Sequence, residues 1–198
     1  MAAPSPAVSS LALVGFMGAG KSAVGMGVAH RRALPFVDSD SVIEEQMGSI
    51  AAIFEEYGEE RFRVVERDVC TAVLGRAAVL PMVASLGGGA VLSGDVRAAL
   101  RGVAHVAWLS APPDVLWERV TADEAAIAES GEETAAAAGR PLVRERAAFD
   151  ALLAARAPLY REVATVVVDN GRGRSLDDVV EELVRLTDPG AVAGVDGA

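Results

Sequence analysis

The chain has one cysteine, few aromatic residues and no apolar stretch that approaches the ~20 residues needed to cross a bilayer. Cys70 has no second cysteine for an intrachain disulfide, and its place on the apolar face of an expected helix indicates a small buried side chain and not a nucleophile. Residues 1–10 lack the basic region and apolar core of a signal peptide. We therefore expect a cytoplasmic protein without a membrane partner.

Basic residues are also fewer than acidic ones: the chain has 18 Lys and Arg and 28 Asp and Glu, which gives a net charge of -10. A nucleic acid partner is disfavoured, since it requires a broad basic surface. Any bound anion must instead be held by a local cluster of cations. Lysine is the rarest base of all: Lys21 stands alone among the 18. A compact ammonium reaches between nucleotide phosphates better than a planar guanidinium does, so Lys21 is a candidate phosphate ligand.

Short apolar runs alternate with helical patterns, which predicts an α/β fold of three layers around a five-stranded parallel sheet. A length of 198 residues fits one domain. We expect a flexible N-terminus over residues 1–10, a single α/β domain over 11–187 and a flexible tail over 188–198. The expected strands are residues 11–14, 34–37, 79–84, 103–109 and 165–168.

Helical patterns fill most of the remaining chain, and one segment stands out from them. The first expected helix begins at Lys21, and the others span residues 41–47, 50–57, 59–74, 93–100, 114–120, 144–155 and 175–186. Gly58 separates the third from the fourth as a natural helix stop. Residues 121–139 are rich in alanine, glycine and carboxylates without a base, so we expect this stretch to be mobile.

The segment Gly15-Phe16-Met17-Gly18-Ala19-Gly20-Lys21-Ser22 fits the P-loop pattern and lies between a predicted strand and a predicted helix. Its glycines let backbone N–H groups surround a phosphate at a helix N-terminus. Lys21 would bridge the β and γ phosphates, and the Ser22 hydroxyl would ligate Mg²⁺. The competing interpretation is a glycine-rich turn that matches by chance. The predicted ATP-binding residues are Gly18, Ala19, Gly20, Lys21, Ser22 and Ala23.

Two further motifs follow predicted strands and should therefore lie at the carboxyl edge of the sheet, where α/β proteins bind ligands. In Asp38-Ser39-Asp40, one carboxylate can orient magnesium-bound water while the other accepts a hydrogen bond from an acceptor hydroxyl. A helix cap or a solvated turn is the alternative. In Ser85-Leu86-Gly87-Gly88-Gly89-Ala90, the glycines allow close approach of the backbone to a ligand, although the motif alone indicates only a loop.

Taken in order, these motifs resemble the shikimate kinases from about Leu11 to Leu186. The matching elements are the P-loop, Asp38-Ser39-Asp40, Ile53-Phe54 through Gly58-Glu59 to Phe62-Arg63 and Glu66, Gly87-Gly88-Gly89, Arg140-Pro141-Leu142, and Arg156-Ala157-Pro158-Leu159-Tyr160-Arg161. The resemblance implies a nucleoside-monophosphate-kinase-like fold and MgATP-dependent phosphorylation of the shikimate 3-hydroxyl, by a protein that we expect to be a monomer.

The resemblance also implies roles for individual residues. Asp40 would hold the acceptor hydroxyls and take part in catalysis, and Gly88 would bind the substrate through its backbone. Arg63 and Arg156 would bind the substrate carboxylate, a task suited to bidentate guanidinium groups. Asp38 would join Ser22 in the magnesium shell. Arg140, in a mobile lid over about residues 119–142, would reach the ATP phosphates and join Lys21 in stabilising the transferring group.

Several alternatives stay open. Arg63 lies at helical spacing from Glu59 and Glu66 and could form a surface ion pair only. Arg156 precedes a Pro158 break and could interact only with a helix C-terminus. The lid is longer and more acidic than in most of the family. Gly173 occupies the place of an arginine that packs on adenine in many members, so that Arg172 or Arg174 could serve instead. The rival functions are a kinase of gluconate or of an amino analogue of shikimate, and a non-catalytic ATP-binding module.

Overall fold

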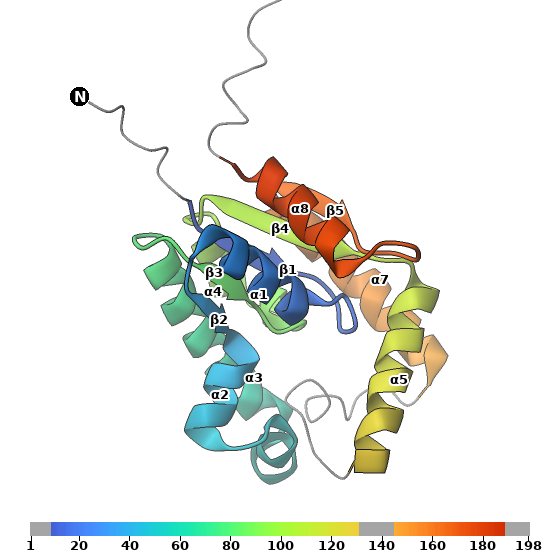
Figure 1. The fold of residues 1–198 in the computed structure, drawn as a ribbon. Helices are drawn as coiled ribbons and strands as arrows, with labels where there is room; N and C mark the ends of the chain where they lie inside the picture. Colours follow the sequence, from blue (N-terminus) through green and yellow to red (C-terminus); the bar gives the residue numbers. More distant parts are fainter. Residues whose placement is uncertain (1–8, 131–144, 189–198) are drawn as a thin grey trace, which may run out of the picture.

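A computed structural model describes residues 9–130 and 145–188, and it places a five-stranded parallel sheet at the centre of the molecule (Figure 1). The strand order is β2-β3-β1-β4-β5. The strands are β1 (Leu11–Val14), β2 (Phe36–Asp38), β3 (Val83–Ser85), β4 (His105–Ser110) and β5 (Val166–Asp169). The predicted α/β class and the five-stranded parallel sheet are therefore confirmed.

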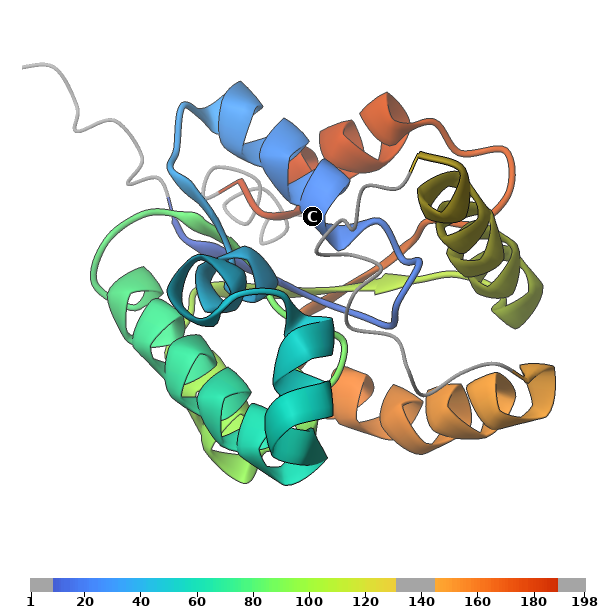
Figure 2. The ribbon, with the colours of Figure 1, turned by 90° about the horizontal axis from the view of Figure 1, so that it is seen from below.

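Helices cover both faces of this sheet, as the view in Figure 2 shows. On one side α1 (Lys21–Arg32) packs against α8 (Leu176–Leu186), and on the other lie α3 (Ile50–Ala77), α4 (Gly94–Leu100) and α7 (Arg146–Val163). The remaining helices are α2 (Ser39–Met47), α5 (Pro113–Ser130) and the 3₁₀ turn η1 (Ala90–Leu92). This arrangement gives the predicted three layers.

All strands but β1 start later than their apolar runs suggested, and in two of them a proline gives the reason. Expected strand 79–84 is reduced to Val83–Ser85, because Val79 and Leu80 are 76% and 57% exposed and Pro81 has no N–H to donate to a neighbouring strand. Expected strand 34–37 begins only at Phe36, directly after Pro35, for the same reason. Ser10, assigned to the flexible N-terminus, is buried and its hydroxyl donates to the Leu80 carbonyl at 2.9 Å.

The core is built mainly from small aliphatic side chains. All four residues of β1 are buried, and large buried rings are confined to a few positions such as Phe16, Phe149 and Tyr160. Cys70 is buried as well, and burial raises the pKa of its thiol. Its prediction as a small core residue is confirmed. In the described part of the chain, no helix combines the length and the apolar character that crossing a membrane requires.

The expected end of the helix at residue 120 was wrong, because the first ten residues of the stretch expected to be mobile are helical. Helix α5 continues to Ser130 instead of ending near Val120. Alanine is the strongest helix former, and the carboxylates of this stretch alternate with it, so local propensity extends the helix. The hydroxyl of Thr121 also donates to the Trp117 carbonyl one turn earlier. The rest of the expected lid, including Arg140, lies outside the described residues.

Helix α7 also runs further than predicted. It passes through Pro158 and ends at Val163, so the expected break does not occur. Proline removes one backbone hydrogen bond, but packing of the following turn compensates: Tyr160 is fully buried and stacks on Trp108, with ring centroids 5.9 Å apart. Arg156 therefore lies in the middle of a helix and not near its C-terminus.

Gly58 interrupts α3 as predicted, with φ 77° and ψ 172°, a conformation that side chains disfavour. We expect Gly58→Ala to lower the free energy of unfolding by about 1 kcal/mol or more through backbone strain. A steric clash does not contribute, because no atom lies within 4 Å of the added methyl group. Gly75, further along α3 and equally unobstructed, is the matched control. Gly75→Ala should raise that free energy by about 0.5–1 kcal/mol. Urea unfolding measures both, and a stabilising effect of Gly58→Ala would contradict the strain.

Candidate functional site

A cavity of about 600 Å³ opens at the carboxyl edge of the sheet. The P-loop, the end of β2, the glycine-rich loop after β3, and helices α3, α5 and α7 all contribute to its walls. The lining includes the cationic side chains of Lys21, Arg63, Arg119 and Arg156 and the carboxylates of Asp38, Asp40 and Glu66. The cavity therefore joins the predicted phosphate loop to the predicted acceptor residues.

The P-loop leads from β1 into α1 as its sequence predicted. Gly20 precedes α1 in a left-handed conformation and provides no side-chain cap, so the first N–H groups of the helix are oriented toward the cavity mouth without a capping side chain. Lys21 Nζ donates to the Phe16 carbonyl at 3.2 Å. The Asn170 amide donates to the Ala19 carbonyl at 2.9 Å and thereby anchors the loop to the end of β5. These features form an anion-binding loop.

Asp38 and Asp40 flank the start of α2, where Asp38 ends β2 and acts as the helix N-cap. Its Oδ1 accepts the Asp40 N–H at 3.0 Å, and its Oδ2 accepts the Ser22 hydroxyl at 2.6 Å. The alternative that this motif is a helix cap is thus correct for one oxygen of Asp38. The other oxygen lies beside the P-loop serine, so capping does not exclude a metal-related role.

Asp40 lies on the cavity wall, and its side chain is half-buried. Protein atoms surround it closely, and other carboxylates lie nearby. Burial raises its pKa to about 7, with further contributions from Asp38 and Glu66, while Lys21 lowers it. A carboxylate with a pKa near neutrality can both hold and release a proton under ordinary conditions, which is the property of a general base.

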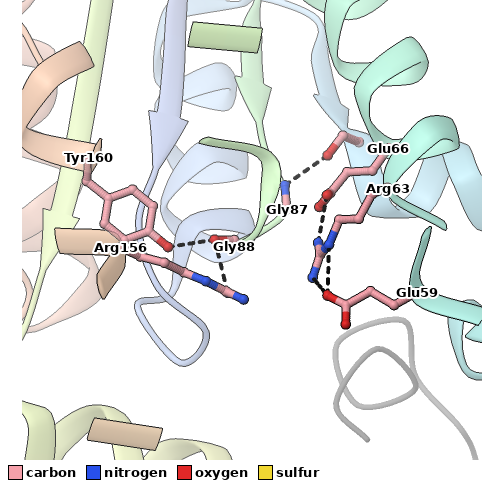
Figure 3. A network of polar contacts seen from close by, with 8 residues as sticks. Glu59, Arg63, Glu66, Gly87, Gly88, Arg156 and Tyr160 are labelled. Carbon is pink, nitrogen blue, oxygen red and sulfur yellow. Dashed lines mark hydrogen bonds and ion pairs between the residues drawn. The ribbon is translucent and has the colours of Figure 1, made fainter. Parts of the chain in front are cut away.

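Arg63 projects from α3 into the cavity between two glutamates (Figure 3). Its Nη1 lies 2.7 Å from Glu66 Oε2, and its Nη2 lies 3.0 Å from Glu59 Oε1. Glu66 is buried, which raises its pKa, whereas the pairing with Arg63 lowers it. The predicted ion pairs with Glu59 and Glu66 are therefore present, and they hold the guanidinium on the cavity wall instead of at the outer surface.

Arg156 reaches the same cavity from α7 on the opposite side of the glycine-rich loop. The residue is only 5% exposed, its guanidinium lies 5.5 Å from the centre of the Phe16 ring, and its Nη1 donates to the Gly88 carbonyl at 3.4 Å. The Tyr160 hydroxyl, one turn further along α7, donates to the same carbonyl at 2.6 Å. A buried arginine facing a cavity requires an anionic partner to offset its desolvation.

Comparison with known proteins gives this arrangement a family. The family model described as shikimate kinase matches residues 17–187. The chain belongs to the shikimate kinase family. The shikimate kinase of Symbiobacterium thermophilum is 41% identical over 178 residues, which cover 88% of this chain and 94% of that protein.

Solved structures place the fold in the same family. The shikimate kinase from Acinetobacter baumannii in complex with shikimate has a TM-score of 0.78 at 31% identity, with 91% of this chain and 93% of that chain covered. A gluconokinase from Sinorhizobium meliloti has a TM-score of 0.56 at 18% identity, covering 94% and 98%, and shares the fold alone. The resemblance to shikimate kinases predicted from the motifs is confirmed.

The structure brings most of the predicted site residues of this shikimate kinase family member to one place. Lys21, Asp40, Arg63, Gly88 and Arg156 all line the cavity. Gly18, Gly20, Ser22, Ala23 and Asp38 line it as well, and Ala19 lies within the same loop. Arg140 falls outside the described residues.

Three residues at the site were missed from sequence. Arg119 lines the cavity and donates from Nη1 to the Gly18 carbonyl at 3.3 Å, yet the sequence analysis gave it no role beyond the approximate start of the expected lid. Tyr160 follows Arg156 at a spacing of four, which places both on one helix face and could have linked them. Asn170 directly follows the last strand at the ligand-binding edge, a position that could have indicated a site residue.

Neither arginine considered for adenine packing is available without breaking an existing contact. Arg172 pairs with Glu118 of α5, and Arg174 pairs with Glu182 of α8 at 2.7 Å. Both pairs hold the loop after β5 to a neighbouring helix.

The raised pKa of Asp40 generates a stability prediction. The folded-state pKa of about 7 lies above the ordinary 3.8, so the stability contributed by the protonated carboxyl is complete below about pH 3.8 and is lost as the pH rises through 7. Asp40→Asn keeps the shape without the buried charge. We expect it to increase the free energy of unfolding more at pH 8 than at pH 5, as measured by urea titration at both values. An equal or smaller gain at pH 8 would contradict the raised pKa.

Proposed function

We propose that this chain transfers the γ-phosphoryl group of ATP to the 3-hydroxyl of shikimate, which gives shikimate 3-phosphate and ADP. The observation that carries the proposal is one cavity that holds the P-loop, a carboxylate and two guanidinium groups from α3 and α7. The relative from Acinetobacter baumannii was solved in complex with shikimate, and family membership supports the same acceptor here.

On the nucleotide side, the P-loop N–H groups and Lys21 are proposed to hold the phosphates, with Ala23 in the first turn of α1. Arg119 contacts the loop through Gly18 and adds a further cation beside it. The family resemblance assigns Arg140 to the ATP phosphates and the transferring group, and we propose that role for it. Such cations oppose the negative charge of the transferring phosphoryl group.

The residues present fit the Mg²⁺ ion that accompanies ATP. The Ser22 hydroxyl and an Asp38 carboxylate oxygen lie side by side at 2.6 Å, and both are hard oxygen ligands. The described residues contain no group of three or more His, Cys, Asp or Glu suited to a metal, which is consistent with an ion held largely by water and substrate phosphates. When bound, Mg²⁺ would supply charge neutralisation at the phosphates. Ser22 and Asp38 are the residues proposed to hold it.

On the acceptor side, Arg63 and Arg156 approach from opposite sides of the glycine-rich loop. Two guanidinium groups suit a carboxylate, because each offers paired N–H donors in one plane. Asp40 is proposed to orient the hydroxyl and to accept its proton as the new bond to phosphorus forms, a role that its pKa of about 7 permits near neutral pH. The backbone of Gly88 completes the acceptor site.

The decisive test is an acceptor panel with the full chain, ATP and Mg²⁺ in a coupled assay of ADP release. Shikimate should give saturable turnover, while gluconate should give none, and Lys21→Ala serves as the control for contaminating kinases. Turnover on gluconate alone, or on an amino analogue in preference to shikimate, would replace the proposed acceptor. ATP binding by calorimetry without acceptor-dependent ADP release would instead identify a non-catalytic module.

The role proposed for Arg63 can be tested against a neighbouring arginine on the same helix. We expect Arg63→Ala to raise the KM for shikimate roughly 10- to 100-fold, because a hydrogen bond to a charged group contributes about 1.5–3 kcal/mol. Arg67, one turn later on α3 and paired with the exposed Asp68, is the matched control. Arg67→Ala should leave this KM within about twofold, since exposed ion pairs contribute little. Equal effects of the two substitutions would refute a substrate contact by Arg63.

A further inference from the structure

We infer that Tyr160 is a positioning residue for the acceptor: its hydroxyl fixes the Gly88–Gly89 peptide so that backbone N–H groups and Arg156 face the substrate together. The inference rests on the proposed function and deepens it. It concerns how the glycine-rich loop, which carries no side chains of its own, is kept in a binding-competent orientation.

The Gly88 carbonyl oxygen is the meeting point of two side chains from α7 (Figure 3). Tyr160 donates to it at 2.6 Å and Arg156 at 3.4 Å. The two residues are four apart, so successive turns of one helix direct both donors to one side of the loop. The shorter contact belongs to tyrosine, which identifies it as the principal anchor, while arginine keeps further N–H donors for a ligand.

Anchoring this carbonyl determines where the Gly89 N–H points. In a planar trans peptide the C=O of one residue and the N–H of the next point in opposite directions. Holding the Gly88 carbonyl toward α7 therefore turns the Gly89 N–H away from α7. Within the described part of the chain, the N–H groups of Gly88 and Gly89 donate to no protein acceptor, whereas the Gly87 N–H donates to the Ser39 hydroxyl at 2.9 Å. The loop thus keeps two donors available to an anionic or hydroxylated ligand.

Tyr160 is suited to this task because its ring cannot move easily. The side chain is fully buried and stacks on Trp108, whose other contacts include the Arg161 guanidinium at 5.3 Å from the ring centre. Burial also raises the pKa of the phenol, so the hydroxyl stays a donor throughout the working pH range. A rigid donor on the carbonyl restricts a loop of three glycines that would otherwise explore many conformations.

The test compares Tyr160→Phe with Tyr57→Phe, which removes the same hydroxyl from an exposed tyrosine outside the cavity lining. We expect Tyr160→Phe to raise the KM for shikimate about tenfold, or about 1.4 kcal/mol, while the KM for ATP and the Kd for ATP measured by calorimetry stay within about twofold. Tyr57→Phe should change none of these constants.

A third variant separates positioning from general loss of stability. Asn170→Ala removes a buried tether of the same kind from the P-loop, where the amide donates to the Ala19 carbonyl. It should raise the KM for ATP more than that for shikimate, the reverse of Tyr160→Phe. Parallel rises of both constants in the two variants, or loss of ATP binding in Tyr160→Phe, would show a structural role only and overturn the inference.

The outcomes also distinguish this inference from the proposed function. Wild-type turnover on shikimate with an unchanged KM in Tyr160→Phe would refute the positioning role and leave the function standing. Wild-type protein without turnover on shikimate would refute the function and the inference together.

Discussion

The parallel register of β1, β2 and β3 is the constraint on which the rest of the site depends. Leu13 of β1 and Asp38 of β2 both pair with Ser85 of β3, so the three strands end in one row. The P-loop, the Asp38-Ser39-Asp40 turn and the triple glycine each follow directly. Parallel strands direct all of these loops to one edge, and hydrogen bonds then join them: Ser22 to Asp38, and Gly87 to Ser39. A slip of one residue in any strand would separate the groups that must act together.

Within that frame, charge of both signs is packed into one cavity of an acidic protein. Arg63 is the clearest case, because its ion pairs and its proposed ligand role are compatible. A guanidinium carries five N–H donors, and the bonds to Glu59 and Glu66 use three of them. The glutamates fix its plane and orientation, which lowers the entropy lost when an anion binds. The ion pairs that the sequence analysis gave as an alternative to a binding role therefore help to orient Arg63 for that role.

The sequence was most informative where local chemistry and position agreed. The P-loop lies between β1 and α1 as predicted, and the interruption at Gly58 follows from backbone sterics alone. The failures arose from competition between local and tertiary effects. Alanine propensity extended α5 through a stretch whose acidity suggested mobility, and burial of Tyr160 carried α7 through Pro158. Arg119 was missed because its role depends on which backbone carbonyl lies nearby, and no sequence pattern specifies that.

Close packing at this edge of the sheet also limits the size of the residues in the triple glycine. None of the three glycines needs a positive φ, so conformational freedom does not explain them. Lack of space explains two of them: a methyl group on Gly87 would lie 2.5 Å from Asp40 Oδ1, and one on Gly89 would lie 2.1 Å from Arg63 Nη1. The loop backbone is therefore in contact with the acceptor carboxylate on one side of the turn and with a guanidinium on the other. Two hydrogen bonds hold this loop in place between them: the Gly87 N–H donates to the Ser39 hydroxyl, and the Tyr160 hydroxyl donates to the Gly88 carbonyl.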